Sequence, residues 1–320
     1  MTALDHPLVS NGAIPALYPC LGICLHLESF TPDDVPRLEE VNGLVLDWLG
    51  ERMRWTLNSA VTRFEPFRPE DLDYVTLYPE HLEVPKSYPV GTQEHVNEQL
   101  VERLKHTDFG MFCHGGQSKS HASPFAYRFY SEICWLADSD VFPTCPVLRL
   151  SVPMDWPLDD FYARATTIAG KLRLRWGNAG LSYSGNAIDF WNDVHEGIYQ
   201  HARRYPGYDP AFYVGFMEEW FRELRTVSWL TWLGPEFRAM VGLLESDSQV
   251  RVQDLGDSLL LQAGSAPLAG DANRRDIPKA YARADQMVRA VRAKQDKNFL
   301  HPWSERLTER WLRRFELRWN

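Results

Sequence analysis

The chain has 320 residues and is 44% hydrophobic, enough to bury the core of one large or two small domains. Its 12 Trp, 13 Tyr and 16 Phe indicate an ordered globule packed around large rings, which excludes long disorder as the default interpretation. The first ten residues contain no Lys or Arg, and no window approaches the roughly 20 apolar residues of a membrane span. We expect a cytoplasmic protein without a secretory signal and without a membrane partner.

The formal net charge of −9 is unevenly distributed along the chain. Residues 28–108 hold 17 acidic and 8 basic side chains, whereas residues 271–320 hold 7 acidic and 13 basic ones. The acidic front half argues against direct nucleic-acid binding by the whole protein, because neutralising phosphates needs clustered Lys and Arg. It suits a basic partner, such as the cleft of a nuclease. Acidic loops that only keep the protein soluble are an equally good interpretation.

The first predicted elements follow a strand–helix–strand order. Residues 20–27 form an apolar strand, and residues 31–34 start a helix, with Thr31 as the cap and Pro32 at the first helical position. The helix runs to about residue 54, and a strand follows over residues 54–58.

The five cysteines have no CxxC spacing. Cys20 and Cys24 share a face of the first strand, where a metal pair is conceivable, but buried free thiols are the favoured interpretation. We expect no disulfide, no metal and no other cofactor.

Residues 64–123 are rich in Pro and acidic side chains, and only residues 92–105 have a helical pattern. Long irregular segments on a compact domain are often functional. We therefore expect this segment to be the recognition surface. Its candidate partner-binding residues are Glu65, Glu70, Asp71, Asp73, Tyr78, Glu80, Glu83 and Tyr88.

A second segment repeats the order of the first. Residues 146–152 form a strand, residues 155–160 start a helix that runs to about residue 174, and residues 181–184 form the return strand. Both segments share a Pro, an Asp-Asp pair and an Arg-Trp pair at matching places. The repetition predicts a duplicated β-α-β unit.

The rest of the chain predicts a strand at 226–232, a short helix from Gly234-Pro235 to Leu244, a hairpin and two final helices. The hairpin pairs residues 249–253 with 258–262, and the helices span about 278–292 and 302–318. The fold class is α+β: duplicated β-α-β units in a mixed sheet or two sheets, packed helices and a helical C-terminus. An N-terminal half, 1–144, and a C-terminal half, 145–320, are two domains or parts of one compact domain.

Two groups of residues are candidates for catalysis. Cys113 and His114 resemble a nucleophile with its base, but neighbours on an extended chain point to opposite sides. Asp189 and Asp193 share a helix face and could hold a metal, although a solvated polar face explains them equally well. The sequence contains no HExxH, GxSxG, P-loop or GxGxxG motif. A hydrolase or transferase of unknown substrate therefore stays the alternative, and a non-enzymatic protein is favoured.

A third hypothesis is a nucleic-acid module built on the basic C-terminal helix. Its Arg side chains could contact phosphates, but Arg-rich amphipathic helices are more often solvated faces paired with Glu. The residues concerned are Arg306, Arg310, Arg313 and Arg314.

The C-terminal third resembles a known family. The resemblance rests on TVSWLTWLG at 226–234, LQAG at 261–264, PLAGDAN at 267–273 followed by Tyr281, and RYPGYD at 204–209. These elements resemble the family once catalogued as domain of unknown function DUF3396, now described as type VI secretion immunity for VRR-NUC nuclease effectors. The clear similarity covers about residues 145–290.

The resemblance implies an antitoxin that neutralises a cognate DNase effector by occluding it. Close relatives could face a VRR-NUC effector or a related restriction-type toxin, and homodimer formation is left open. Physically, we interpret the motif residues as scaffold, because glycines permit sharp turns and Asp and Asn satisfy backbone donors. These residues are Trp229, Gly264, Pro267, Gly270, Asp271 and Asn273.

Overall fold

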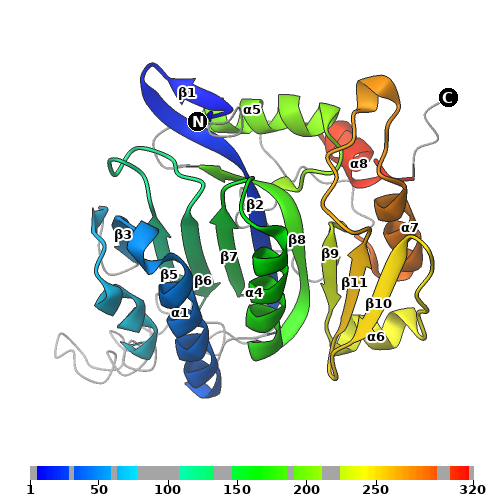
Figure 1. Cartoon of the computed structure of the whole chain (residues 1–320), viewed down its shortest axis with the longest axis horizontal. Helices are drawn as coiled ribbons and strands as arrows, with labels where there is room; N and C mark the ends of the chain where they lie inside the picture. Colours follow the sequence, from blue (N-terminus) through cyan, green and yellow to red (C-terminus); the bar gives the residue numbers. More distant parts are fainter. Residues whose placement is uncertain are drawn as a thin grey trace, which may run out of the picture.

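The computed structural model describes residues 6–28, 32–58, 63–77, 108–132, 146–185, 191–210, 224–293 and 303–316. Within them, eleven strands form one sheet in the order β10-β11-β9-β8-β2-β7-β6-β5-β3-β4, with β1 paired to β2 (Figure 1). The strands are β1 (Val9–Asn11), β2 (Ile14–Leu27), β3 (Trp55–Asn58), β4 (Glu65–Pro66), β5 (Asp108–His114), β6 (Ala126–Glu132), β7 (Val147–Val152), β8 (Leu174–Gly185), β9 (Leu230–Leu233), β10 (Val250–Asp254) and β11 (Leu259–Ala263).

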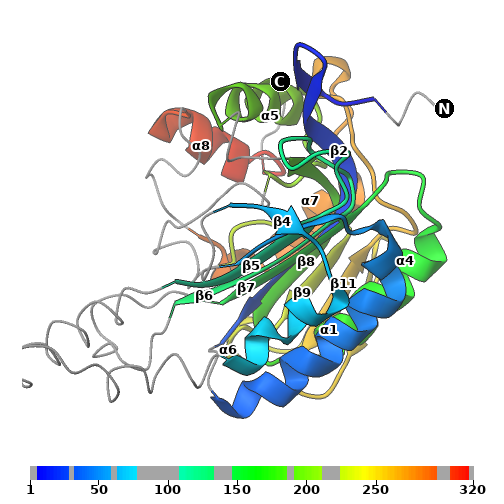
Figure 2. The same cartoon turned by 90° about the vertical axis from the view of Figure 1, so that its left-hand side faces the viewer.

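Helices cover both faces of this sheet. They are α1 (Val35–Leu49), α4 (Leu158–Lys171), α5 (Trp191–Arg204), α6 (Pro235–Val241), α7 (Lys279–Met287) and α8 (Glu305–Leu312). Short 3-10 turns are η1 (Pro32–Asp34), η2 (Gly50–Arg52), η3 (Pro69–Leu77), η6 (Ala272–Arg274) and η7 (Arg289–Val291). Figure 2 shows α1 and α4 side by side on one face, and α5 and α8 on the other.

The central strands are buried on both faces because helices lie on each side. Every residue of β7 is buried, as are the last eight residues of β2. The face of β2 that carries Cys24 and His26 is polar: Cys24 pairs in register with Arg149 of β7 and Asn178 of β8. All four side chains are buried. One face of the sheet therefore contains buried groups that need hydrogen-bond partners.

The α+β class is confirmed, and both predicted strand–helix–strand orders are present as β2-α1-β3 and β7-α4-β8. The sequence left a mixed sheet or two sheets open. The described strands instead form one sheet in which all named pairs are antiparallel. The two segments share one sheet because their strands interleave. β2 of the first segment lies between β8 and β7 of the second, so the helix of each segment crosses over a strand of the other.

The predicted hairpin is confirmed, with Val250 opposite Ala263 and Asp254 opposite Leu259. Gly256 adopts φ of +87° in the turn, where a residue without a Cβ is favoured. Several predicted helix ends were wrong. The helix after Gly234 ends at Val241 because Gly242, with φ of +68°, stops it before Leu244, and the last two helices are shorter than expected. Residues 92–105 and Thr31 lie outside the described part of the chain.

Candidate functional site

One end of the sheet carries a concentration of acidic side chains. Residues 32–77 contain ten acidic and five basic residues. Five exposed carboxylates from the C-terminal part of α1, η2, β4 and η3 make up what we call the acidic edge: Asp47, Glu51, Glu65, Glu70 and Asp73. It lies around β3 and η3, on the left of Figure 1. Exposed carboxylates of one sign attract a basic partner.

A buried amide fastens the acidic edge to the sheet. Asn42 of α1 donates from Nδ2 to the Leu72 carbonyl in η3 at 2.9 Å, and its Oδ1 accepts from the Tyr127 hydroxyl of β6 at 2.6 Å. Asn42 and Leu72 are buried, and so is Tyr127. One side chain thus connects the helix, the acidic turn and the sheet.

Three of the predicted contact residues, Glu65, Glu70 and Asp73, are exposed on this edge. Asp71 is different, because its carboxylate accepts from the Arg68 backbone N–H at 2.8 Å and pairs with the Arg68 guanidinium at 3.3 Å. Its side chain is only 10% exposed. Asp71 therefore shapes the turn. Tyr78, Glu80, Glu83 and Tyr88 lie outside the described residues.

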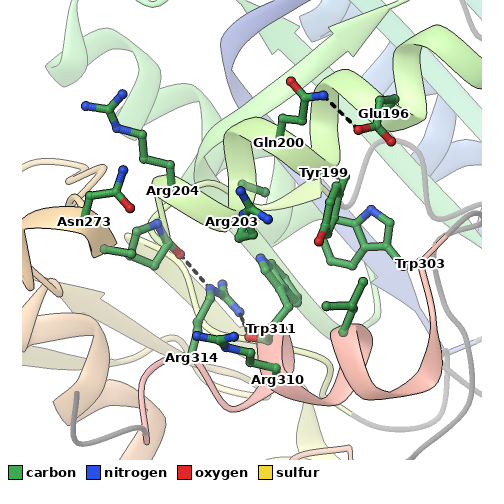
Figure 3. Close-up of a pocket in the computed structure, with 14 residues that line it drawn as sticks. Glu196, Tyr199, Gln200, Arg203, Arg204, Asn273, Trp303, Arg310, Trp311 and Arg314 are labelled. Atoms are coloured by element: carbon green, nitrogen blue, oxygen red, sulfur yellow. Dashed lines mark hydrogen bonds between the residues drawn. The ribbon is translucent and has the colours of Figure 1, made fainter. Parts of the chain in front are cut away.

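A second charged feature, which we call the basic cleft, lies between α5 and α8 (Figure 3). It is a cavity of about 630 Å³. Four arginines and one glutamate are among its lining residues, together with aromatic side chains. The lining residues are Glu196, Tyr199, Gln200, Ala202, Arg203, Arg204, Pro206, Ala272, Asn273, Trp303, Leu307, Arg310, Trp311 and Arg314.

Arg314 fixes the C-terminal end of α8 to the segment that follows α5 and to the segment that precedes β9. Its guanidinium donates to the carbonyls of Pro206 at 2.6 Å and Trp311 at 3.1 Å, and to the Thr226 hydroxyl at 2.9 Å. Burial lowers the pKa of Arg314 to about 9, so the side chain is still charged at neutral pH. The position of α8 over α5, and hence the cleft, depends on these hydrogen bonds.

Beneath Arg314 lies a buried ion pair. Arg225 and Asp209 are 3.1 Å apart with side chains 2% and 5% exposed. Asn178 of β8 donates to the Asp209 carboxylate at 3.3 Å and to the Thr226 carbonyl at 3.0 Å. These contacts join the sheet to the two segments, around Pro206 and Thr226, to which Arg314 is hydrogen-bonded. A buried pair that is also hydrogen-bonded keeps one geometry, and breaking it is costly.

A family model described as type VI immunity for VRR-NUC matches residues 56–315, which is well over half of the chain. The chain belongs to this family. It is an immunity protein of the type VI secretion system, and the resemblance expected from residues 204–281 is confirmed over a longer stretch than the sequence motifs covered.

Among solved structures, the immunity protein has the same fold as a type VI secretion system protein of Pseudomonas aeruginosa. The TM-score is 0.73, the alignment covers 96% of this chain and 86% of the other, and the two are 18% identical. At that identity the similarity establishes the fold alone. A search of the curated proteins gives no match.

The family motif lies next to the basic cleft. The Asp271 carboxylate accepts from the Asn273 backbone N–H at 3.0 Å and from Arg204 at 3.1 Å. The hydrogen bond from Arg204 holds the pKa of Asp271 below its ordinary value. Gly270 has φ of +66°, and a Cβ there would lie 2.6 Å from the Asp276 carbonyl oxygen. The motif turn thus orients Arg204, a cleft residue.

The remaining motif residues support the hairpin. Trp229 is buried, and its indole N–H donates to the Gly264 carbonyl at 3.2 Å. Gly264 has φ of +80°, which favours glycine. Pro267 is half-buried in the stretch that follows, where the Leu268 N–H donates to the Tyr281 hydroxyl at 3.2 Å.

Cys113 and His114 project to opposite sides of β5. Cys113 is fully buried, 3.5 Å from the Thr56 hydroxyl, and burial raises the pKa of its thiol to about 12. His114 packs at 4.8 Å from the Phe64 ring, and burial lowers its pKa to about 4. At neutral pH the thiol is protonated and the histidine does not reach it. This pair does not form an activated nucleophile.

The other candidate groups give little chemistry. Asp189 lies outside the described residues, and Asp193 falls within α5. The described part of the chain contains no group of three or more His, Cys, Asp or Glu side chains arranged to hold a metal ion.

Cys20 and Cys24 are buried free thiols, as is Cys113, while Cys134 and Cys145 are outside the described residues. No helix in those residues is long and apolar enough to cross a membrane.

The proposed row of C-terminal arginines is not a single surface. Arg306, Arg310 and Arg313 are exposed, whereas Arg314 is 3% exposed and points inward. Arg313 pairs with Glu309 at 3.2 Å. The sequence reasoning missed the cleft because its aromatic wall comes from two distant helices. The sequence signal that could have indicated the cleft was the spacing of Tyr199 and Arg203, which lie one turn apart on α5, together with the Arg- and Trp-rich C-terminal helix.

Proposed function

We propose that this immunity protein neutralises its nuclease effector by covering the effector's DNA-binding surface with the acidic edge. The family match supplies the class of partner, a VRR-NUC effector. The observation that carries the proposal is the exposed carboxylates of Glu65 in β4 and of Glu70 and Asp73 in η3, the turn that Asn42 fastens to the sheet. Nuclease surfaces that bind DNA are rich in Lys and Arg, so an acidic surface can replace the phosphates.

In this proposal the immunity protein acts in the cytoplasm as a protein ligand, makes no contact with DNA and catalyses no reaction. The masking is steric and electrostatic. Tyr78, Glu80, Glu83 and Tyr88 follow the acidic edge in sequence, and they belong to the same proposed contact surface. The negative potential speeds the encounter, and a few buried contacts at the centre determine how long the complex lasts.

We also interpret the two strand–helix–strand segments as copies of one duplicated unit. Support comes from their shared order and from α1 and α4, which lie side by side on one face of the sheet.

Charge reversal tests the proposed contact surface. The triple variant Glu65→Lys, Glu70→Lys and Asp73→Lys should bind the purified cognate nuclease roughly 100-fold more weakly, since each rim or buried charge contributes to rate or affinity. Cells that co-express this variant with the nuclease should die. The matched control is Glu245→Lys, Asp257→Lys and Glu305→Lys, three exposed residues away from the acidic edge with the same change in net charge.

Binding is measured by calorimetry at low and high salt, and thermal unfolding checks that both variants are folded. If the acidic-edge variant binds as well as the control and still protects the cells, the proposed contact surface is wrong.

A further inference from the structure

The basic cleft plays no part in the masking just described. It lies at the other end of the molecule from the acidic edge, on the opposite face of the sheet (Figures 1 and 2). We propose that it is a second contact site for the effector, which receives an acidic side chain of the effector together with a neighbouring apolar one. The inference rests on the proposed function, because that function supplies the protein partner.

Positive charge at the mouth of the cleft comes from two arginines. Arg203 of α5 and Arg310 of α8 are exposed and lie on opposite walls. Arg204 and Arg314 also line the cleft, where Arg204 pairs with Asp271 and Arg314 donates to backbone carbonyls. A guanidinium presents a planar pair of donors that matches a carboxylate, so an acidic side chain fits between the two walls.

An aromatic wall lies beside this charge. The Tyr199 ring makes an edge contact with Trp303 at 5.3 Å, and Trp303 makes another with Trp311 at 6.2 Å. The guanidinium of Arg203 lies 5.5 Å from the centre of the Tyr199 ring. Tyr, Trp and Arg are the residue types most enriched where protein interfaces gain their affinity. Trp303 and Trp311 are 3% and 5% exposed, so they support the half-buried Tyr199 ring from behind. A small inorganic anion would need only the charges, whereas the Tyr199 ring favours a peptide that adds an apolar side chain.

The charge pattern favours a protein over a nucleic acid. A DNA backbone needs a row of cations spaced along a groove. Here Glu196, which accepts from Gln200 at 2.8 Å, lies within the cleft. Arg313 is paired with Glu309 on the same helix. A cavity of about 630 Å³ lies in the size range of pockets that enclose a compact group of atoms, such as side chains of a partner.

The test is a charge reversal confined to the cleft. Affinity for the purified cognate nuclease is measured for the full-length double variant Arg203→Glu, Arg310→Glu. The control is Arg251→Glu, Arg306→Glu, with the same change in net charge at exposed residues outside the cleft, one of them on α8. We expect the cleft variant to bind roughly tenfold or more weakly than the control, the effect of losing an arginine anchor. Tyr199→Ala should weaken binding in the same direction.

Equal affinities of the cleft variant and the control would overturn the inference, while the masking proposal would still stand if the acidic-edge variant had lost binding. If the nuclease does not bind the wild-type protein at all, both fall. A labelled short DNA duplex forms the second arm: binding by the wild type that the cleft variant abolishes would make the cleft a nucleic-acid site and refute the inference. Circular dichroism and thermal unfolding check folding, and the milder pair Arg203→Gln, Arg310→Gln replaces the double variant if it is unfolded.

Discussion

The acidic edge and the basic cleft are both charged surfaces, but they are held in place by different kinds of contact. The acidic edge lies over an apolar core of Val45, Leu46, Phe67 and Leu72, with Asn42 as its main polar connection. The basic cleft lies over buried charges, with Arg225, Asp209 and Arg314 beneath it. Surface charge of one sign can therefore rest on an uncharged core, whereas a buried polar network here positions two distant helices around a cleft.

The largest effect should follow from breaking that network. Arg225→Ala leaves the Asp209 carboxylate buried without its cation, which should lower the free energy of unfolding by about 4 kcal/mol. The loss should also release α8 and reduce effector binding through the cleft. Urea unfolding measures the stability. Arg238→Ala is the control, because it removes an exposed ion pair with Asp254, which water screens, and should therefore cost far less. Equal costs for the two variants would contradict the distinction between the regions.

A smaller effect is expected at the acidic edge. Asn42→Ala leaves the Leu72 carbonyl and the Tyr127 hydroxyl buried without their partner, which should cost about 3 kcal/mol. Tyr127→Phe removes one of these two hydrogen bonds and should cost about 1 kcal/mol. Unfolding followed by near-UV circular dichroism checks both. Nearly neutral behaviour of Asn42→Ala would mean that apolar packing alone holds the edge.

The smallest expected effect is a pH dependence that comes from two histidines. Burial lowers the pKa of His114, near the acidic edge, and of His201, on α5, to about 4. The unfolded chain therefore binds these protons first as the pH falls below the ordinary histidine pKa of about 6.5. Stability is fully present above that pH and is lost progressively down to about pH 4.

Unfolding measured at about pH 7 and about pH 5 should show a loss of about 2 kcal/mol from His114, which is the better buried of the two. His114→Gln should remove that part of the pH dependence and leave the part from His201. An unchanged pH profile in the variant would show that His114 makes no contribution.

Much of the local structure could be predicted from the sequence. The apolar run at 20–27, the Gly-Asp turn of the hairpin and the strand–helix–strand orders each depend on neighbours along the chain, and the structure contains them. The exposed Glu65, Glu70 and Asp73 were recognised by composition, since acidic residues in a Pro-rich stretch stay at the surface. The family resemblance of the C-terminal third came from motif residues that make local turns.

The order of strands and the basic cleft could not be predicted in this way. Only the tertiary structure places β2 between β7 and β8, because strand pairing depends on contacts between residues over a hundred positions apart. The sequence grouped Arg314 with Arg310 as one basic surface, although one is buried against the Pro206 carbonyl and the other lines the cleft mouth. An arginine is exposed or donates hydrogen bonds inside the protein depending on which segments pack against it. Those segments are distant in sequence, so the sequence of the helix alone does not distinguish the two cases.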